Sequence, residues 1–209
     1  MSVYQNYTHD FPYRCRKLLE KAKTHEFFKD HDVTFMLMVA SAGLTVPYER
    51  LRSDSQFEHP AGDRDIYPNA SIVLDDLLKQ PFLHSILWAD EARSWCYGGL
   101  QSAKNDPDSW PELQTPQFIR NTTTVKDVLL IIRIGLAHGN IFTKSGFNNE
   151  IMALIFVSGG YDQKNNRYIP LKYISVAPND FYDFLVKWFN FLDTISIPDF
   201  ILHNEFDAV

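Results

Sequence analysis

The chain has 209 residues, a length that fits a single domain. Its composition, 45% hydrophobic and 14% aromatic, excludes the disordered, collagen-like and low-complexity classes. The formal net charge is −6, from 20 Lys+Arg and 26 Asp+Glu, which offers no overall attraction to polyanions. A nucleic-acid partner would therefore have to bind at a local site.

Cysteine content and hydropathy indicate the cytoplasm. Cys15 and Cys96 are the two cysteines, too few for a disulfide scaffold and without metal-ligand spacing. The N-terminal residues contain no secretory signal pattern, and the longest uncharged run, 33–48, is too short to span a membrane. We expect a cytoplasmic protein with no membrane partner.

Helical spacing predicts two helices in the first quarter of the chain. The first begins near Pro12 and has its apolar residues on one side. The second is capped by Asp32, and Gly43 and Pro47 are expected to bend it or divide it into two.

Two segments have the composition of long loops. Residues 52–68 are rich in charge and proline and show no period, which indicates a surface loop of the kind that often carries function. Helical spacing returns over 71–80. Residues 97–120, with the pair Gly98-Gly99 and three prolines, are again predicted to be a loop.

A helix of about four turns is predicted after residue 124. Thr124 and Asp127 have the spacing of a capping box, and the apolar residues that follow have helical spacing. Gly139 with Asn140 predicts a left-handed stop.

The period then changes to that of strands. β-branched and aromatic runs on either side of a polar segment predict one hairpin over 151–176, and Asp180 with Asp183 is predicted to cap a last helix with an aromatic face. The sum is a mainly α fold, a helical bundle with one inserted β-hairpin near the C-terminal end. We predict one domain over residues 1–209 with its core over 12–195.

Several kinds of site are excluded by missing motifs. The chain has no GxxxxGK[ST] or GxGxxG pattern and no GxSxG nucleophile elbow. Histidines and acidic residues are scattered without metal-ligand spacing, so we expect no metal and no cofactor.

Arg133 and His138 stand out because the helix around them is otherwise almost entirely apolar. A guanidinium in such a helix must reach water or a partner. Five residues of separation place the two side chains about 140° apart around the helix, so they can converge on a small anion only near its loosened end. An Arg that steadies phosphate charge and an imidazole that moves a proton suit phosphodiester chemistry. An interhelical ion pair, with a histidine that compensates the helix dipole, explains the same residues without chemistry.

The stretch RIGLAHGN, an Arg, four residues and then His-Gly-Asn at a helix end, is followed by an apolar hairpin and an amphipathic helix. This order resembles the HEPN superfamily, whose signature is an Arg, four to six residues and a His in a helical bundle. The stretch FMLMVASAGLTVPYERL is similar to a group of bacterial HEPN proteins.

The resemblance implies a metal-independent endoribonuclease that acts on RNA as a homodimer, used as a toxin or in antiviral defence, with an antitoxin or other protein as a possible partner. It implies that Arg133 binds the scissile phosphate and that His138 is the acid or base. Local basic character is expected near Arg133, with Lys126, Lys144 and Arg120 as contributors. Asn140 is a candidate for a hydrogen bond to substrate or for the helix C-cap.

Ile134 departs from the family pattern, because the residue after the Arg is commonly polar in active members. This leaves a second hypothesis, a catalytically inactive HEPN-like dimer that binds a protein or nucleotide. A third is a structural dimer in which Arg133 pairs with a carboxylate across the interface.

Overall fold

The computed structural model describes residues 7–26, 31–52, 68–88, 94–103, 106–146, 150–162 and 166–195. These residues form two compact units, residues 1–79 with 185–209 and residues 80–184, and each unit is described by itself. Nearly all of the predicted loop 52–68 lies outside the described residues. The single domain over 1–209 stays a prediction.

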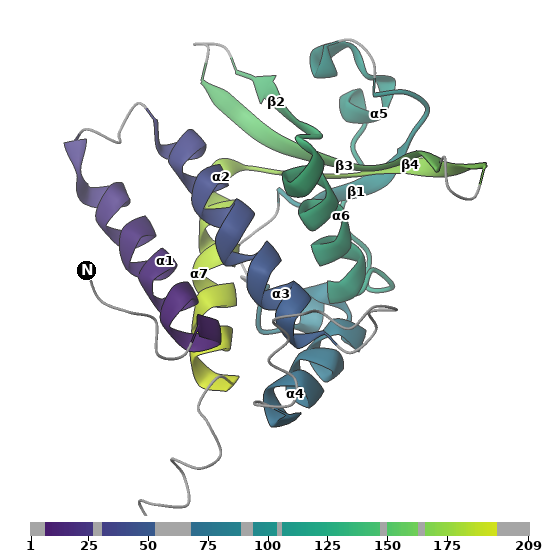
Figure 1. Cartoon of the computed structure of the whole chain (residues 1–209). Coiled ribbons are helices and arrows are strands. Elements are labelled where there is room, and N and C mark those ends of the chain that lie inside the picture. Colours follow the sequence, from purple (N-terminus) through teal and green to yellow (C-terminus); the bar gives the residue numbers. More distant parts are fainter. Residues whose placement is uncertain are drawn as a thin grey trace, which may run out of the picture. The chain divides into compact units, whose positions relative to one another are not determined.

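The first unit contains helices from both ends of the chain (Figure 1). Its elements are α1 (Tyr7–Thr24), α2 (Asp32–Gly43), α3 (Thr45–Leu51), α4 (Pro68–Lys79) and the C-terminal half of α7 (Pro178–Ile195). The predicted division of the second helix is confirmed, since α2 ends at Gly43. A Cβ there would lie 2.7 Å from Cε1 of Phe189, and the Trp188 indole N–H donates to the Gly43 carbonyl at 3.1 Å. Gly43 therefore permits close packing of α2 against α7.

Two helix starts differ from the prediction. Helix α1 begins at Tyr7, and Pro12 lies inside it instead of at its start. Asp32 is the first residue of α2, preceded by His31 at the N-cap, and its carboxylate accepts the Val33 N–H at 2.7 Å. Local side-chain patterns fix helix ends only to within a few residues.

The second unit is built on a four-stranded antiparallel sheet (Figure 1). Its strand order is β1 (Cys96–Leu100), β4 (Arg167–Val176), β3 (Ile151–Asp162) and β2 (Ile141–Ser145). The prediction of a mainly α bundle with one inserted hairpin is therefore wrong: the fold is mixed α/β. The predicted hairpin is real and forms the centre of the sheet as β3 and β4, but strands on both of its sides were missed.

The missed strand β1 lies at the start of the predicted loop 97–120. That segment also holds a 3-10 turn, η3 (Pro107–Ser109), and the short helix α5 (Pro111–Gln114). Consecutive glycines are poor strand formers, which is why the pattern favoured a loop. The strand is nevertheless paired along its length with β4, and the ring of Tyr173 covers Gly98, its cross-strand partner.

The two faces of the sheet are covered by different parts of the chain. Helix α6 (Val125–His138) packs on the face that carries Phe156, where a Cβ on Gly135 would lie 3.1 Å from the Phe156 Cβ. Side chains alternate along a strand, so Ile155 and Val157 face the opposite side. There they join a buried cluster with residues of β1, β4 and α5 and with Trp110, which lies between η3 and α5; the other members are Cys96, Leu100, Leu113 and Tyr173.

Helix α7 has the predicted apolar face. Its members Phe181, Phe184, Leu185, Trp188 and Leu192 are all buried. Asp180 is not the N-cap, because α7 starts at Pro178. Within the second unit its carboxylate accepts hydrogen bonds from the backbone N–H and the hydroxyl of Ser94.

Candidate functional site

The helix that carries Arg133 and His138 is closed at its N-terminus by the predicted capping box. The Asp127 N–H donates to Oγ1 of Thr124 at 3.2 Å, and the Thr124 N–H donates to the Asp127 carboxylate at 3.0 Å. Two backbone donors that the helix itself cannot satisfy are thereby bonded. The start of α6 is fixed by its own sequence.

Its C-terminus is also as predicted. Gly139 has a φ of 69°, in the left-handed region that favours glycine, and the Asn140 N–H donates to the Gly135 carbonyl at 2.9 Å. The Asn140 carbonyl accepts the Val157 N–H at 3.0 Å, so the backbone enters the sheet immediately after the helix stop. The Asn140 backbone thus serves the C-cap, and the structure assigns no hydrogen bond to its side chain among the described residues.

Arg133 and His138 lie at the two edges of one partly exposed stripe of α6. Arg133 and Ile134 are half-buried, whereas Ala137 and His138 are exposed. At about 100° per residue, Arg133 and His138 are about 140° apart, and Ala137 lies between them on the arc. Because alanine has no side chain beyond Cβ, Ala137 places little bulk between Arg133 and His138 on the helix surface.

Ile134 lies on the same stripe, one turn before His138. It is therefore between the guanidinium and the imidazole in angle, where the family pattern commonly has a polar side chain. Among the described residues no protein group forms a hydrogen bond with the His138 ring, so nothing within the described chain fixes its orientation. An isoleucine at this place supplies no such bond.

The other basic residues predicted near the site lie on different elements of the structure. Lys126 is exposed and lies seven residues before Arg133, on the same side of α6. Lys144 is on β2, and its ammonium group donates to the Leu113 carbonyl at 3.0 Å. Arg120 donates to the side-chain oxygen of Gln117 at 3.1 Å. By its position on α6, Lys126 belongs with the stripe, whereas Lys144 and Arg120 donate to protein groups outside α6.

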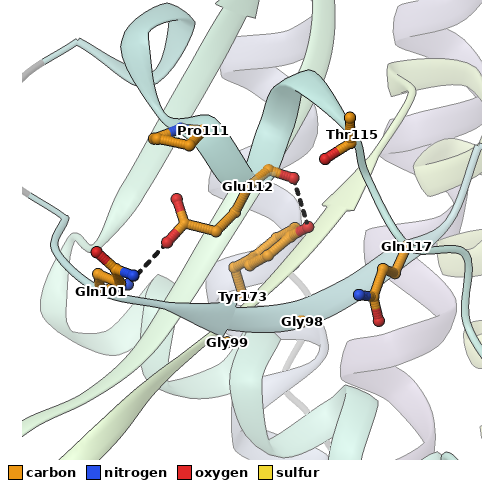
Figure 2. A pocket seen from close by; sticks show the side chains of 8 residues that line it. All are labelled: Gly98, Gly99, Gln101, Pro111, Glu112, Thr115, Gln117 and Tyr173. Carbon is orange, nitrogen blue, oxygen red and sulfur yellow. Dashed lines mark hydrogen bonds between the residues drawn. The ribbon is translucent and has the colours of Figure 1, made fainter.

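A polar cavity of about 330 Å³ lies beside Tyr173, on the face of the sheet opposite the one that α6 covers. Figure 2 shows the residues that line it. Sequence reasoning missed it, because its walls come from three separated segments. The lining residues are Gly98, Gly99, Gln101, Pro111, Glu112, Thr115, Gln117 and Tyr173. The one available signal was the glycine pair, which in a strand often marks a close approach of another group.

Two polar interactions shape this cavity (Figure 2). The Glu112 carboxylate accepts the backbone N–H of Gln101 at 3.0 Å, and the Tyr173 hydroxyl donates to the Glu112 carbonyl at 3.3 Å. Burial raises the pKa of the Tyr173 hydroxyl, and the nearby Cys96 and Glu112 raise it further. The phenol is therefore a neutral donor at physiological pH.

Two further features bear on what the chain can bind. In the described ranges there is no group of three or more His, Cys, Asp or Glu side chains placed to hold a metal ion. None of the helices described is long and apolar enough to cross a membrane.

The chain is similar to a known protein family. A family model described as HEPN pEK499 p136 matches residues 1–199. The comparisons with curated proteins and with solved structures gave no match. The matched segment includes the whole of α6 and nearly the entire chain, and the chain therefore belongs to the HEPN pEK499 p136 family.

Proposed function

We propose that this protein is a metal-independent endoribonuclease whose reacting groups are Arg133 and His138. Membership of a HEPN family supports a nuclease or RNA-related module in general. The observation that carries the finer proposal is the placement of the two side chains at the edges of one accessible stripe of α6, with Ala137 between them.

The charge of the site fits a phosphodiester. The carbonyl groups at the C-terminus of a helix carry partial negative charge, which opposes an anion there. The Arg133 guanidinium offsets this repulsion and can bind two phosphate oxygens at once. Lys126, on the same side of α6, adds a second positive charge along the path of the RNA backbone.

The reaction needs only the groups of the protein and the RNA. The 2′-hydroxyl loses its proton to an imidazole and attacks the adjacent phosphorus, while the bond from phosphorus to the 5′-oxygen breaks. The leaving oxygen takes a proton from an imidazolium, and Arg133 stabilises the charge on the phosphoryl oxygens. The products are a 2′,3′-cyclic phosphate and a 5′-hydroxyl.

A second copy of the chain completes this scheme. One imidazole cannot be base and acid in the same step, whereas two copies of α6 supply two histidines. In the proposed dimer the exposed stripes pair, so that the Arg133 of one chain acts together with the His138 of the other. We therefore propose a homodimer. Its mass can be measured by gel filtration coupled to light scattering.

The central experiment incubates the purified protein with RNA in EDTA and compares the wild type with His138→Ala. His84→Ala is the matched control, because His84 is an exposed histidine of the same unit and is away from the stripe. The wild type and the control are expected to release 2′,3′-cyclic phosphate ends, and His138→Ala is expected to lose this activity. Cleavage that continues unchanged in His138→Ala rules out the role of the histidine.

A binding module without turnover is the second candidate, and Ile134 favours it. If the wild type binds RNA or a protein without cleaving RNA, the variant Ile134→Asn shows whether the site lacks only an orienting group or has lost catalysis for other reasons. A site that lacks only an orienting group gains cleavage on this substitution, and a module that lost catalysis for other reasons does not.

The biological role that we propose is that of a cytoplasmic toxin or antiviral effector, with an antitoxin or other partner protein. Induced expression of the wild type is then expected to arrest growth of a bacterial host. Expression of His138→Ala at equal protein level is expected to leave growth normal. Arrest by both proteins would show that the toxicity does not come from cleavage.

A further inference from the structure

The outer edge of strand β1 borders the cavity of Figure 2, and there the backbone groups of Gly99 have no hydrogen-bond partner among the described residues. The Tyr97 N–H donates outward to the Gln117 carbonyl at 2.9 Å, and the Gln101 N–H donates outward to the Glu112 carboxylate at 3.0 Å. Backbone groups of every second residue point to the same edge of a strand. The N–H and C=O of Gly99 therefore point outward too, between these two satisfied positions.

Among the described residues, no protein group bonds to the Gly99 N–H on that edge. Gly99 lines the cavity and is exposed, and the absence of a side chain leaves its backbone accessible. The cavity thus offers a backbone donor and a backbone acceptor from Gly99, and its lining also includes the Glu112 carboxylate. An added β-strand does not fit, because it would need the positions of Tyr97 and Gln101 that the protein already occupies.

Charge narrows the class of ligand. Among the described residues that line the cavity, Glu112 is the one carboxylate, and none is a Lys or Arg. An anion is therefore disfavoured inside, and a ligand with several N–H donors is favoured. Of the two Glu112 oxygens, Oε1 holds the Gln101 N–H, and the carboxylate retains further acceptor capacity.

We propose that this cavity binds a guanine base by its Watson–Crick edge. The Gly99 N–H donates to the base O6, and the Glu112 carboxylate accepts from N1–H and the 2-amino group. Guanine is the base that places an acceptor beside two adjacent donors in this order. A guanidinium group also has two donors for a carboxylate but has no acceptor for the Gly99 N–H. The volume of about 330 Å³ suits a nucleoside.

The site is independent of the proposed nuclease site. The ring of Tyr173 and the cavity lie on one face of the sheet, whereas α6 packs on the other face, against Phe156. Guanine binding is thus expected to be the same in the wild type and in His138→Ala. If the proposed nuclease activity is refuted, guanine binding in this cavity is still expected.

To test this proposal, the full-length protein is titrated with guanosine, inosine, adenosine and arginine methyl ester, and binding is measured by ligand-observed NMR. Guanosine is expected to bind most tightly, inosine more weakly because it lacks the amino group, and the other two not measurably. Glu112→Gln keeps an oxygen for the Gln101 N–H but loses the second acceptor, so guanosine affinity is expected to fall at least about tenfold. Glu150→Gln, at an exposed glutamate of the same unit, is the matched control and is expected to bind as the wild type does.

A second variant distinguishes loss of guanosine binding from loss of folding. Thr115 is exposed and lines the cavity, so Thr115→Trp fills the space without removing a buried contact and is expected to abolish binding. Equal binding of adenosine and guanosine, preference for the arginine ester, no binding of guanosine by the wild type, or unchanged affinity in both variants would each overturn the proposal.

The source of the base is decided by two further arms. Guanosine monophosphate represents a free nucleotide, and a short oligoribonucleotide with one central guanine represents RNA. If the oligonucleotide competes with guanosine at lower concentration than the mononucleotide does, the cavity reads a base in RNA. The reverse order assigns it to a free guanine nucleotide.

Discussion

Gly98 and Gly99 are adjacent in β1, yet alanine is expected to have opposite effects at the two positions. A Cβ on Gly98 would lie 2.8 Å from Cε1 of Tyr173, closer than carbon atoms approach without displacement. A Cβ on Gly99 would have its nearest neighbour, the Leu171 carbonyl oxygen, at 3.7 Å, an ordinary contact. The comparison therefore isolates the role of one aromatic ring.

The magnitude follows from how little the ring can move. Tyr173 is 1% exposed, and its hydroxyl is held by the Glu112 carbonyl. Overpacking of this kind costs about 1–3 kcal/mol, and the lower flexibility of alanine in the unfolded chain returns about 0.4–1 kcal/mol. Gly98→Ala is expected to lower the free energy of unfolding by about 1–2 kcal/mol, and Gly99→Ala to leave it unchanged or raise it slightly.

Urea denaturation followed by tryptophan fluorescence measures both variants, and a double-mutant cycle tests the cause. In a Tyr173→Ala background the clash is absent, so Gly98→Ala is expected to cost nothing further. If Gly98→Ala is equally destabilising with and without the tyrosine ring, or if Gly99→Ala is the more harmful substitution, the packing argument is refuted.

Three other outcomes are expected. Thr124→Ala removes half of the capping box and should destabilise the protein by about 1 kcal/mol, whereas Thr124→Ser, which keeps the acceptor for the Asp127 N–H, should not; thermal unfolding distinguishes them. Burial raises the pKa of Asp193 above 3.8, although the Arg16 guanidinium, 2.6 Å away, lowers it. The folded state therefore binds the proton of Asp193 more tightly than the unfolded state does. The free energy of unfolding is expected to fall as pH rises from 3.8 through the raised pKa. Asp193→Asn should abolish this fall in urea unfolding measured across that range, and an unchanged pH profile would contradict the assignment. Burial raises the pKa of Cys15 to about 11, so its thiol should resist alkylation until the chain unfolds. Native protein is treated with iodoacetamide at pH 8 and analysed by mass spectrometry. Rapid modification of Cys15 would contradict the prediction.

The sequence was most informative where the determinants of structure are local. The capping residues Thr124 and Asp127, the stop at Gly139 and the periodicity between them predict α6 almost to the residue. The strands β3 and β4 were predicted for the same reason, since a hairpin joins neighbouring runs of β-forming residues.

What the sequence did not reveal depends on distant partners. Strand β1 has a glycine pair that disfavours a strand, and it forms because Tyr173, far along the chain, covers Gly98. The short β2 is the exception, because its partner β3 follows it in sequence, but β2 comes so soon after α6 that the pattern showed only the end of the helix. The cavity could not be predicted either, because Gly99, Glu112 and Tyr173 meet only after the sheet has formed.

The link between α6 and β2 has a consequence for how this protein can change in evolution. Gly139 and Asn140 alone separate the last helical residue from the first residue of the strand, and the Asn140 carbonyl is already bonded to Val157. An inserted residue here would turn the helix by about 100° or move the strand by one residue, which exchanges its two faces. The orientation of His138 is thereby coupled to strand register, so this junction should accept a change of side chain at Asn140 far more readily than a change of length.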